Sequence, residues 1–470
     1  MNSPADAAAF VPRLMPDAMR AALHSRFGAR FATGLAVREQ HGRDESPIDA
    51  PPPEAVVFCE SVEDVAFAVA EAARHGVPVI PFGAGSSLEG HLLAVQGGVS
   101  LDLSRMNRLV QVDAQDLTVT VQAGVTRLQL NREIRDTGLF FPIDPGADAT
   151  LGGMCATRAS GTNAVRYGTM RDNVLALQVV TATGEVIRTG TRARKSSAGY
   201  DLTRLLVGSE GTLGVITEVT LRLHPLPESV AAAICSFDDA KSAVDTTIAV
   251  IQCGVPIARC ELLDANAVIA VNAHDKLGLA EKPMLLMEFH GSAASVAEQA
   301  ETVQALACEH GGTAFQWATT PEERTRLWTA RHHAFLSGLQ MRPGGRAVTT
   351  DCCVPISALA DAVTQALAEA DAAGLPHFLV GHVGDGNFHV AYLIDPGRPA
   401  ERDTAEALNA ALVRRAIAAG GTCTGEHGIG LHKQGFLVVE AGEGAIAMMR
   451  QLKRALDPGN ILNPGKIFAM

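Results

Sequence analysis

The chain has 470 residues, of which 47% are hydrophobic, 4% are aromatic and 45 are glycine, and its net charge is −12. This length is too great for one ordinary hydrophobic core, so we expect two or more domains. The negative charge argues against a protein that binds nucleic acid or anionic membranes. No apolar run approaches the roughly 20 residues of a membrane span.

Nine cysteines are scattered through the sequence, and residues 1–6 lack the basic and apolar regions of a signal peptide. An odd number of cysteines without a leader fits reduced thiols in the cytoplasm better than disulfides. The sequence has no haem-attachment motif and no ferredoxin-like cysteine run. If the protein is a redox enzyme, its electrons must therefore leave to another molecule.

The first half of the chain predicts alternating strands and helices. A helix over 17–27 precedes the stiff segment Pro51–Pro53, and Ser61 can cap a second helix with Asp64 at its third position, ending near Arg74. The predicted strands are 56–58, 77–80, 99–103, 118–121, 175–182 and 214–223. We also expect a helix over 125–137, whereas the Gly-rich stretch 144–173 carries few periodic signals.

The clearest internal boundary is Pro225-Leu226-Pro227. Beyond it, apolar strands and helices follow one another without Gly-rich loops. The predicted elements are 230–236, 240–252, 284–291, 296–309 and a tail helix over 444–457 that ends at Asp457-Pro458-Gly459.

Three Gly-rich segments of the first half lie between predicted strands: 81–90, 152–168 and 208–216. Glycine lets a ligand approach the backbone, and successive backbone N–H groups form anion-binding concavities. Gly- and Ser-rich loops are most often plain turns, and segment 81–90 lacks the spacing of a Rossmann fingerprint. Together the three segments predict a cradle for one extended ligand that contains a diphosphate.

A hairpin signal stands at Gly381–His389, where Asp385-Gly386 is typical of a two-residue turn. Such a turn pairs position 382 directly with position 389, which places two imidazoles on one face of the ribbon, about 5 Å apart at Cβ. Glu426 is a third candidate ligand, and two histidines with one carboxylate form a common divalent-metal set. The alternative is a polar surface hairpin with hydrogen-bonded histidines.

Taken together, these segments resemble the vanillyl-alcohol-oxidase-type flavoproteins, in their acceptor-linked, FAD-dependent D-lactate dehydrogenase branch. The resemblance runs from about residue 50 to the end, and it implies an α+β fold with a two-subdomain FAD-binding domain and an α+β cap domain. The stretches that carry it are 81–85, 144–148, 166–173, 208–214, 327–332, 381–389 and 421–428. The expected domains are an N-terminal helical segment 1–50, an FAD domain 51–227, a cap or substrate domain 228–420 and a C-terminal segment 421–470 that returns to the flavin.

The resemblance also implies which residues contact FAD. Relatives with covalent FAD carry a histidine in the first Gly-rich loop, whereas Gly83–Ser87 has none, so we expect non-covalent FAD. The expected FAD contacts are Pro81, Gly83, Ala84, Gly85, Ser86, Ser87, Gly90, Pro145, Gly146, Leu151, Gly152, Gly153, Ser160, Gly161, Tyr167, Gly168, Glu210, Gly211, Gly214, Ile216 and Asn463.

By the same resemblance, His382, His389 and Glu426 hold one divalent ion, Zn or Mn. His427 is the expected catalytic base, and an unperturbed imidazole titrates near 6.5, in a suitable range for that role. The resemblance assigns Arg331 as the clamp for the substrate carboxylate, which a guanidinium pairs bidentately. The expected substrate contacts are Arg331, Asn387 and Thr349.

These expectations describe an enzyme that oxidises D-2-hydroxy acids, above all D-lactate to pyruvate. Relatives that oxidise 2-hydroxyglutarate carry a lysine near position 349, which is absent from Ala347–Asp351, although Arg342 and Arg346 lie nearby. The alternatives are a D-2-hydroxyglutarate dehydrogenase, a glycolate oxidase catalytic subunit, a metal hydrolase and a non-catalytic flavin-binding subunit. The expected electron acceptor is cytochrome c, a quinone or an electron-transfer flavoprotein. We expect a cytoplasmic protein or one peripheral to the inner membrane, and a homodimer is compatible with the sequence.

Overall fold

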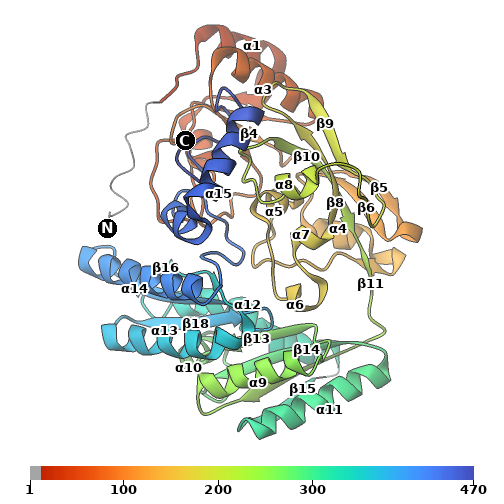
Figure 1. Cartoon of the computed structure of the whole chain (residues 1–470), viewed down its shortest axis with the longest axis vertical. Coiled ribbons are helices and arrows are strands. Elements are labelled where there is room, and N and C mark those ends of the chain that lie inside the picture. Colours follow the sequence, from red (N-terminus) through yellow and green to blue (C-terminus); the bar gives the residue numbers. More distant parts are fainter. Residues whose placement is uncertain (1–11, 319) are drawn as a thin grey trace. The chain divides into compact units, whose positions relative to one another are not determined.

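The computed structural model describes residues 12–318 and 320–470, and Figure 1 shows its helices and strands. The chain divides into two compact units. Unit 1 contains the described residues up to Ser160, together with Thr169–Leu226 and Glu426–Met470. Unit 2 contains Gly161–Gly168 and Pro227–Gly425. The C-terminal segment thus returns to the unit that the N-terminal half of the chain builds.

Unit 1 begins with a four-stranded sheet in which β2 and β3 both run parallel to the central β4. Helix α3 (Val62–His75) begins where Ser61 accepts a hydrogen bond from the Asp64 backbone N–H, as the sequence predicts. Helix α1 (Asp17–Phe27) buries Met19 and Leu23 in the same core. The strands of this sheet, in spatial order, are β1 (Phe31–Ala32), β2 (Ala55–Phe58), β4 (Val99–Asp102) and β3 (Val79–Phe82).

A second sheet of unit 1 is antiparallel and has five strands. Its strands, in spatial order, are β5 (Leu109–Asp113), β6 (Thr118–Gln122), β10 (Val215–Arg222), β8 (Val174–Val180) and β9 (Val186–Gly190). The short pair β7 (Leu139–Phe140) and β11 (His224–Pro225) lies apart from it. The predicted helix over 125–137 is shorter, because α4 (Arg127–Glu133) gives way to a 3₁₀ turn over Arg135–Thr137.

The remaining helices of unit 1 are mostly short. The Gly-rich stretch without periodic signals contains α5 (Leu151–Thr157) and α7 (Met170–Asn173), which are too short to show a helical period. The others are α2 (Leu35–His41), α8 (Leu202–Leu206) and the long α15 (Gln434–Leu456). Helix α15 begins ten residues before the predicted tail helix and is interrupted at Gly442, whose φ is +77°.

Unit 2 is built on one large sheet of eight strands, all of whose pairings are antiparallel. Its strands, in spatial order, are β15 (Thr313–Ala318), β12 (Ser229–Ser236), β14 (Met284–Gly291), β13 (Arg259–Leu263), β18 (His377–His382), β19 (Asn387–Ile394) and β16 (Arg346–Thr349), with β17 (Cys352–Cys353) also pairing with β19. Strands β12 and β14 and helix α9 match the elements that the sequence predicts within one residue.

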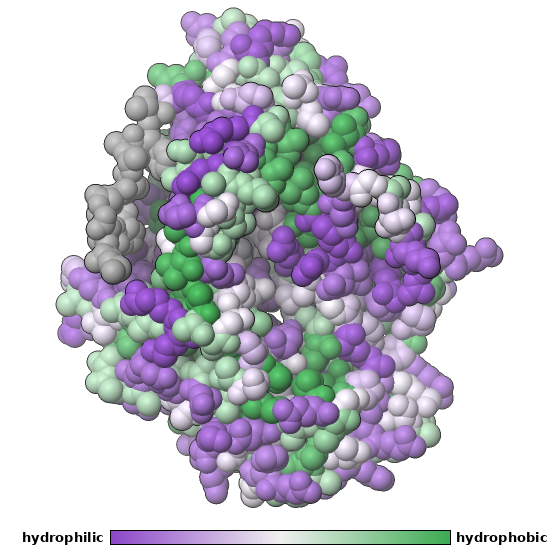
Figure 2. Space-filling view, in the orientation of Figure 1, coloured by the Kyte–Doolittle hydropathy of each residue, from purple (hydrophilic) through white to green (hydrophobic). Residues whose placement is uncertain are grey.

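Seven helices of the described chain belong to unit 2, and one of them is the four-residue α6 (Ala164–Tyr167). The other six are α9 (Ala240–Gln252), α10 (Ala265–Asp275), α11 (Ala293–Glu309), α12 (Pro321–Leu339), α13 (Leu359–Ala373) and α14 (Pro399–Ala418). On the face that Figure 2 shows, hydrophilic residues predominate and apolar residues lie between them in small groups. No helix among the described residues is both long enough and apolar enough to cross a membrane. All nine cysteines lie in the described ranges, and each is a free thiol.

Candidate active site

The two histidines of the predicted hairpin lie on neighbouring strands of unit 2, but in a different register from the predicted one. His382 pairs with Asn387 and Val380 pairs with His389, so the turn has four residues, Val383–Gly386. The prediction that His382 lies directly opposite His389 is therefore wrong. A two-residue type I′ turn needs positive φ at both central residues, and only Gly386 has it (φ +86°), whereas Asp385 does not.

The observed pairing differs from the predicted one by two residues, and this difference keeps both imidazoles on one face of the sheet. His389 follows Asn387 by two residues, and side chains two positions apart on a strand share a face. The ring centroids of His382 and His389 are 5.6 Å apart, and the rings are nearly perpendicular. The two side chains are thus diagonal neighbours, within reach of one shared ligand.

Both histidines are oriented through Nδ1. His382 Nδ1 donates to Glu261 Oε1 at 2.8 Å, and His389 Nδ1 donates to the Thr350 carbonyl oxygen at 3.0 Å. When Nδ1 carries the proton of a neutral imidazole, Nε2 carries the lone pair. A carboxylate or carbonyl that fixes the tautomer in this way is typical of metal-binding histidines. The geometry of this pair therefore suits metal ligation through the two Nε2 atoms.

Glu261, on β13, links the histidine pair to Arg331. Its side chain is 1% exposed, and its second oxygen accepts from Arg331 Nε at 2.7 Å. Burial alone raises the pKa of Glu261, but the charges and hydrogen bonds of His382 and Arg331 outweigh it, so the pKa falls below its ordinary value. Glu261 was not among the predicted site residues, although a carboxylate inside the apolar strand Arg259–Leu263 is a signal visible in the sequence.

Arg331 does not lie on the solvated face that its charged neighbours on α12 suggest. Its side chain is 13% exposed and pairs with the buried Glu261. The same carboxylate therefore holds a guanidinium and an imidazole. This places a group that can bind a carboxylate beside one histidine of the predicted metal pair.

A second buried carboxylate, that of Asp351, accepts hydrogen bonds from two side chains near the histidine pair. It accepts from Asn387 Nδ2 at 3.0 Å and from Thr424 Oγ1 at 2.7 Å. Thr349 pairs with Ala391, two residues from His389, so Thr349 shares the histidine face. The expected substrate contacts Asn387 and Thr349 thus lie on the same face as the histidine pair, whereas Asp351 was not predicted.

The two arginines that could have bound a second substrate carboxylate have other positions. Arg342 makes a bidentate pair with Glu401, at 2.6 and 3.1 Å, and donates to the Leu393 carbonyl. Arg346 pairs with Ile394 and lies three residues before Thr349, so its side chain leaves the opposite face of β16. The Arg342 guanidinium is thus engaged by Glu401, and the Arg346 side chain lies on the face opposite the histidines.

The expected base His427 belongs to unit 1, where it borders a buried charge cluster. Glu89, at the end of the first Gly-rich loop, accepts from His432 Nδ1 and Lys433 Nζ, both at 2.9 Å, and lies 3.6 Å from His427 Nδ1. Burial opposes ionisation of Glu89, but Lys433 and the two histidines lower its pKa strongly. This cluster ties the segment with His427 to the first Gly-rich loop.

Two of the three Gly-rich segments predicted to bind the cofactor, 81–90 and 208–216, meet within unit 1 near Thr150. A Cβ atom on Gly83 would lie 2.3 Å from Thr150 Oγ1, and one on Gly211 would lie 3.1 Å from Pro81 Cγ. Asn463 Nδ2 donates to the Glu210 carbonyl oxygen at 2.7 Å, which brings the C-terminal segment to the same place. Segments 81–90 and 208–216, Thr150 and Asn463 therefore pack closely against one another in unit 1.

Two polar side chains of this region differ in whether they have a partner within the protein. Ser209 Oγ is buried and has no hydrogen-bond partner among the described residues. The Glu210 carboxylate is held by the backbone N–H groups of Ile429 and Gly430, at 2.7 and 2.9 Å. The convergence of glycine-rich segments and one unpartnered buried hydroxyl is compatible with an extended, polar ligand such as FAD. The expected contacts Gly161, Tyr167 and Gly168 instead belong to unit 2, where the Tyr167 hydroxyl lies 2.7 Å from His290 Nδ1.

Two family models match successive parts of the chain. Residues 53–190 match the family model "FAD binding domain", and residues 226–467 match "FAD linked oxidases, C-terminal domain". The chain is 50% identical to a "Probable D-lactate dehydrogenase, mitochondrial" of Danio rerio, over 93% of this chain and 89% of that one. It is 46% identical to a "D-lactate dehydrogenase [cytochrome], mitochondrial" of Arabidopsis thaliana, over 88% of this chain and 73% of that one.

Two further comparisons extend this similarity. A "Glycolate oxidase subunit GlcD" of Bacillus subtilis is 35% identical over 93% of this chain and 94% of its own. The structure of a 4-ethylphenol oxidase from Gulosibacter chungangensis superposes with a TM-score of 0.81 at 19% identity, covering 97% of this chain and 98% of that one. The predicted α+β fold of the vanillyl-alcohol-oxidase type is confirmed, and the chain belongs to the FAD-linked oxidases of that family.

Proposed function

We propose that this protein oxidises D-lactate, or another short D-2-hydroxymonocarboxylate, to the corresponding 2-oxo acid. The observation that carries the proposal is the shared contact of Arg331 and His382 with the buried Glu261, which sets a carboxylate-binding group beside an oriented histidine pair. The names of the Danio rerio and Arabidopsis thaliana relatives support the same substrate.

In this proposal three segments of the chain divide the work. Residues 51–227 bind FAD non-covalently, residues 228–420 form the substrate cap and residues 421–470 complete the site. FAD, when bound, supplies the hydride acceptor, and a divalent ion supplies a Lewis acid for the substrate hydroxyl. The reaction then needs the protein to hold the substrate carboxylate and to take up the hydroxyl proton.

The residues of this chain can meet both needs. Arg331 binds the carboxylate in a fixed orientation, because Glu261 holds its Nε, and a guanidinium pairs with a carboxylate through its N–H groups. Asn387 and Thr349 offer polar contacts to the substrate from the histidine face. His427 accepts the hydroxyl proton, and its contact with Glu89 positions the imidazole.

We further propose that His382, His389 and Glu426 bind one divalent ion, Zn or Mn. The two histidines present Nε2 because their Nδ1 atoms are held by Glu261 and Thr350. Glu426 directly follows Gly425, whose backbone is so close to Asn387 that a Cβ would lie 2.1 Å from Nδ2. Imidazole with carboxylate accepts several divalent metals, so metal analysis of the purified protein must identify the ion.

The electrons leave to an external acceptor, and the name of the Arabidopsis thaliana relative favours a cytochrome over a quinone or an electron-transfer flavoprotein. The names of two relatives place those proteins in mitochondria, whereas for this chain we keep the cytoplasm as the proposed location. A homodimer is the proposed assembly, and light scattering of the purified protein tests it.

The second candidate function is glycolate oxidation, as in the name of the Bacillus subtilis relative. Glycolate carries the same hydroxyl and carboxylate as lactate but lacks the methyl group, so the same residues could hold it. A single experiment separates the candidates: the oxidised flavin spectrum is recorded anaerobically while D-lactate or glycolate is added. Fast bleaching by D-lactate with slow bleaching by glycolate supports the first proposal, and the reverse order supports the second.

A further inference from the structure

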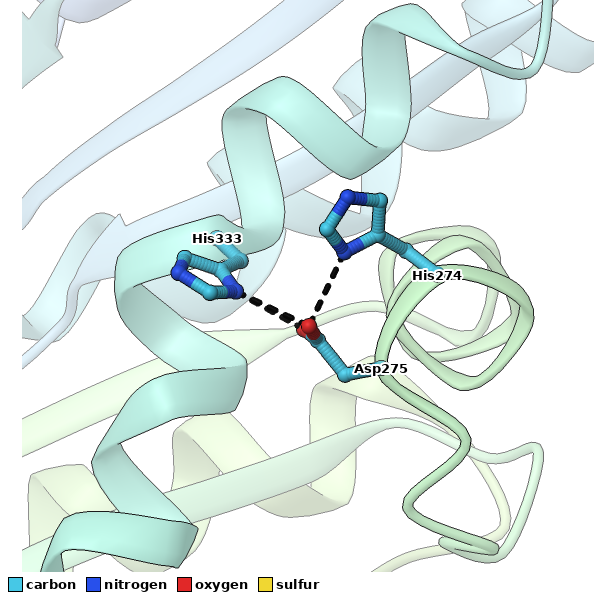
Figure 3. A group of neighbouring side chains, drawn as sticks. All are labelled: His274, Asp275 and His333. Atoms are coloured by element: carbon cyan, nitrogen blue, oxygen red, sulfur yellow. Dashed lines mark hydrogen bonds and ion pairs between the residues drawn. The ribbon is translucent and has the colours of Figure 1, made fainter.

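A second group of potential metal ligands lies in unit 2, between helices α10 and α12. His274 and Asp275 end α10, and His333 lies in the middle of α12 (Figure 3). His274 Nδ1 and His333 Nδ1 both lie 2.9 Å from the same oxygen, Oδ1 of Asp275. The two imidazole rings meet edge to face, with centroids 5.6 Å apart. Three side chains from two helices thus converge on one point.

The spacing of the three ligand atoms suits a small cation. One atom from each side chain lies within 4.8 Å of the other two. A tetrahedral ion with bonds of about 2.0–2.1 Å holds its ligand atoms about 3.3 Å apart. Since the nitrogen–oxygen distances are now 2.9 Å, they need to open by only a few tenths of an ångström. Side-chain rotation alone supplies such a movement.

The protonation of the group is also compatible with an ion. The Asp275 carboxylate lies between the two imidazoles and faces Nδ1 of each. A neutral imidazole can carry its single proton on Nε2 instead of Nδ1. Both Nδ1 atoms can then bind a metal ion. The side chains of His274 and His333 are 36% and 42% exposed, so water can complete the coordination.

This group is separate from the proposed substrate site. His333 follows Arg331 by two residues, and positions two apart on a helix point about 200° away from each other. Arg331 contacts Glu261 on β13, whereas His333 contacts Asp275 on α10. An ion held here would join α12 to α10 without displacing the substrate clamp.

We propose that His274, Asp275 and His333 form a second divalent transition-metal site, of the Zn, Ni or Cu class, which fastens α12 to α10. Two imidazoles and one carboxylate form a ligand set for these ions, and their affinity for nitrogen ligands exceeds that of Mg or Ca. Bound metal stabilises the folded protein by mass action, because the unfolded chain does not hold the three ligands together.

The test measures zinc binding to the FAD-loaded protein after chelator treatment, by equilibrium dialysis and elemental analysis. A variant with both His382→Ala and His389→Ala serves as the background, because it lacks the histidines of the proposed active-site metal. We expect this background to bind one zinc ion per chain. Adding His333→Ala should weaken that binding by about tenfold or more, since one ligand of three is lost.

Two further variants complete the design. Asp275→Asn preserves shape and hydrogen bonding but removes the charge, so it should weaken zinc binding while the metal-free protein keeps its Tm. His310→Ala removes a partly exposed histidine outside the group and should leave zinc binding unchanged. Zinc should also raise the Tm of the background protein, and this increase should vanish with Asp275→Asn. Zinc binding that is equal with and without His333→Ala and Asp275→Asn would overturn the proposal.

Discussion

The buried carboxylate of Glu261 lies 2.8 Å from Nδ1 of His382 and fixes the orientation of that ring. The same carboxylate receives Nε of Arg331 at 2.7 Å. One side chain inside the sheet therefore orients a proposed metal ligand and a proposed substrate clamp together. A change at this position should disturb both functions at once, although Glu261 itself contacts neither substrate nor metal in the proposal.

We expect Glu261→Gln to weaken binding of the active-site metal by about 10–100-fold, the usual effect of removing a carboxylate behind a metal-binding histidine. KM for D-lactate should rise as well, because Arg331 loses its charged partner. FAD content should stay unchanged, since Glu261 belongs to unit 2 and the Gly-rich segments 81–90 and 208–216 belong to unit 1. Metal analysis, steady-state kinetics and the flavin spectrum check the three expectations. Glu298→Gln, on the exposed face of α11, is the matched control.

The sequence predicted which face the two histidines share but not how their strands pair. His382 and His389 are separated by an odd number of positions, so they share a face whether the turn has two residues or four. The prediction of a shared face therefore did not depend on the register. The register depended on the φ angle of Asp385, which the dipeptide Asp385-Gly386 favours but does not determine. The helix α5, only seven residues long, was missed because a helical period needs a longer window.

Glu261 and Glu89 were missed for a different reason. Each is a single carboxylate beside apolar or glycine-rich sequence, and its partners lie 70 to 344 residues away in the chain. A pattern of spacing cannot reveal such contacts, because they exist only after the strands and loops have assembled. For Arg331 the sequence suggested exposure rather than burial. The charged residues that precede it on α12 are typical of a solvated face, whereas the side chain of Arg331 is mostly buried.

His382→Ala and His389→Ala should each lose the active-site metal and almost all activity while keeping FAD. Each change removes one imidazole whose Nε2 is the proposed ligand, and neither residue lies in unit 1. Metal content per chain and the ratio of flavin to protein absorbance give the two readings. His310→Ala is again the control. A metal-free preparation of either variant with full activity would contradict the assignment.

Acid denaturation should release FAD into solution. The Gly83–Ser87 segment contains no histidine that could form a covalent bond to the flavin. The flavin fluorescence of the supernatant after precipitation measures the released fraction. Fluorescence that stays with the protein band on a denaturing gel would instead show a covalent link.

His427→Ala should retain both FAD and metal but reduce the flavin about 10²–10⁴-fold more slowly with D-lactate, which is the usual effect of removing a positioned base. Anaerobic stopped-flow spectroscopy gives the rate directly, independent of the electron acceptor. His432→Ala is an informative comparison, because it removes another imidazole that contacts Glu89 and leaves His427 in place. If the flavin of the His427 variant is reduced within a factor of a few of the wild-type rate, another group accepts the proton.

D-Lactate and slightly larger D-2-hydroxymonocarboxylates should react faster than D-2-hydroxyglutarate, and L-lactate should be nearly inert. Arg342 is paired with Glu401 and Arg346 leaves the opposite face of its strand, so neither is placed to meet a second carboxylate. Burying that charge without a partner costs several kcal/mol, so kcat/KM should favour D-lactate by more than about tenfold.

For L-lactate, fixing the hydroxyl and the carboxylate directs the methyl group to where the D-enantiomer presents hydrogen. Adding a lysine tests the same charge argument. Thr349→Lys places the lysine on the histidine face and should raise kcat/KM for D-2-hydroxyglutarate. Val348→Lys places it on the opposite face and should not. Similar kcat/KM values for D-lactate and D-2-hydroxyglutarate in the wild-type protein would show that another cation serves the second carboxylate.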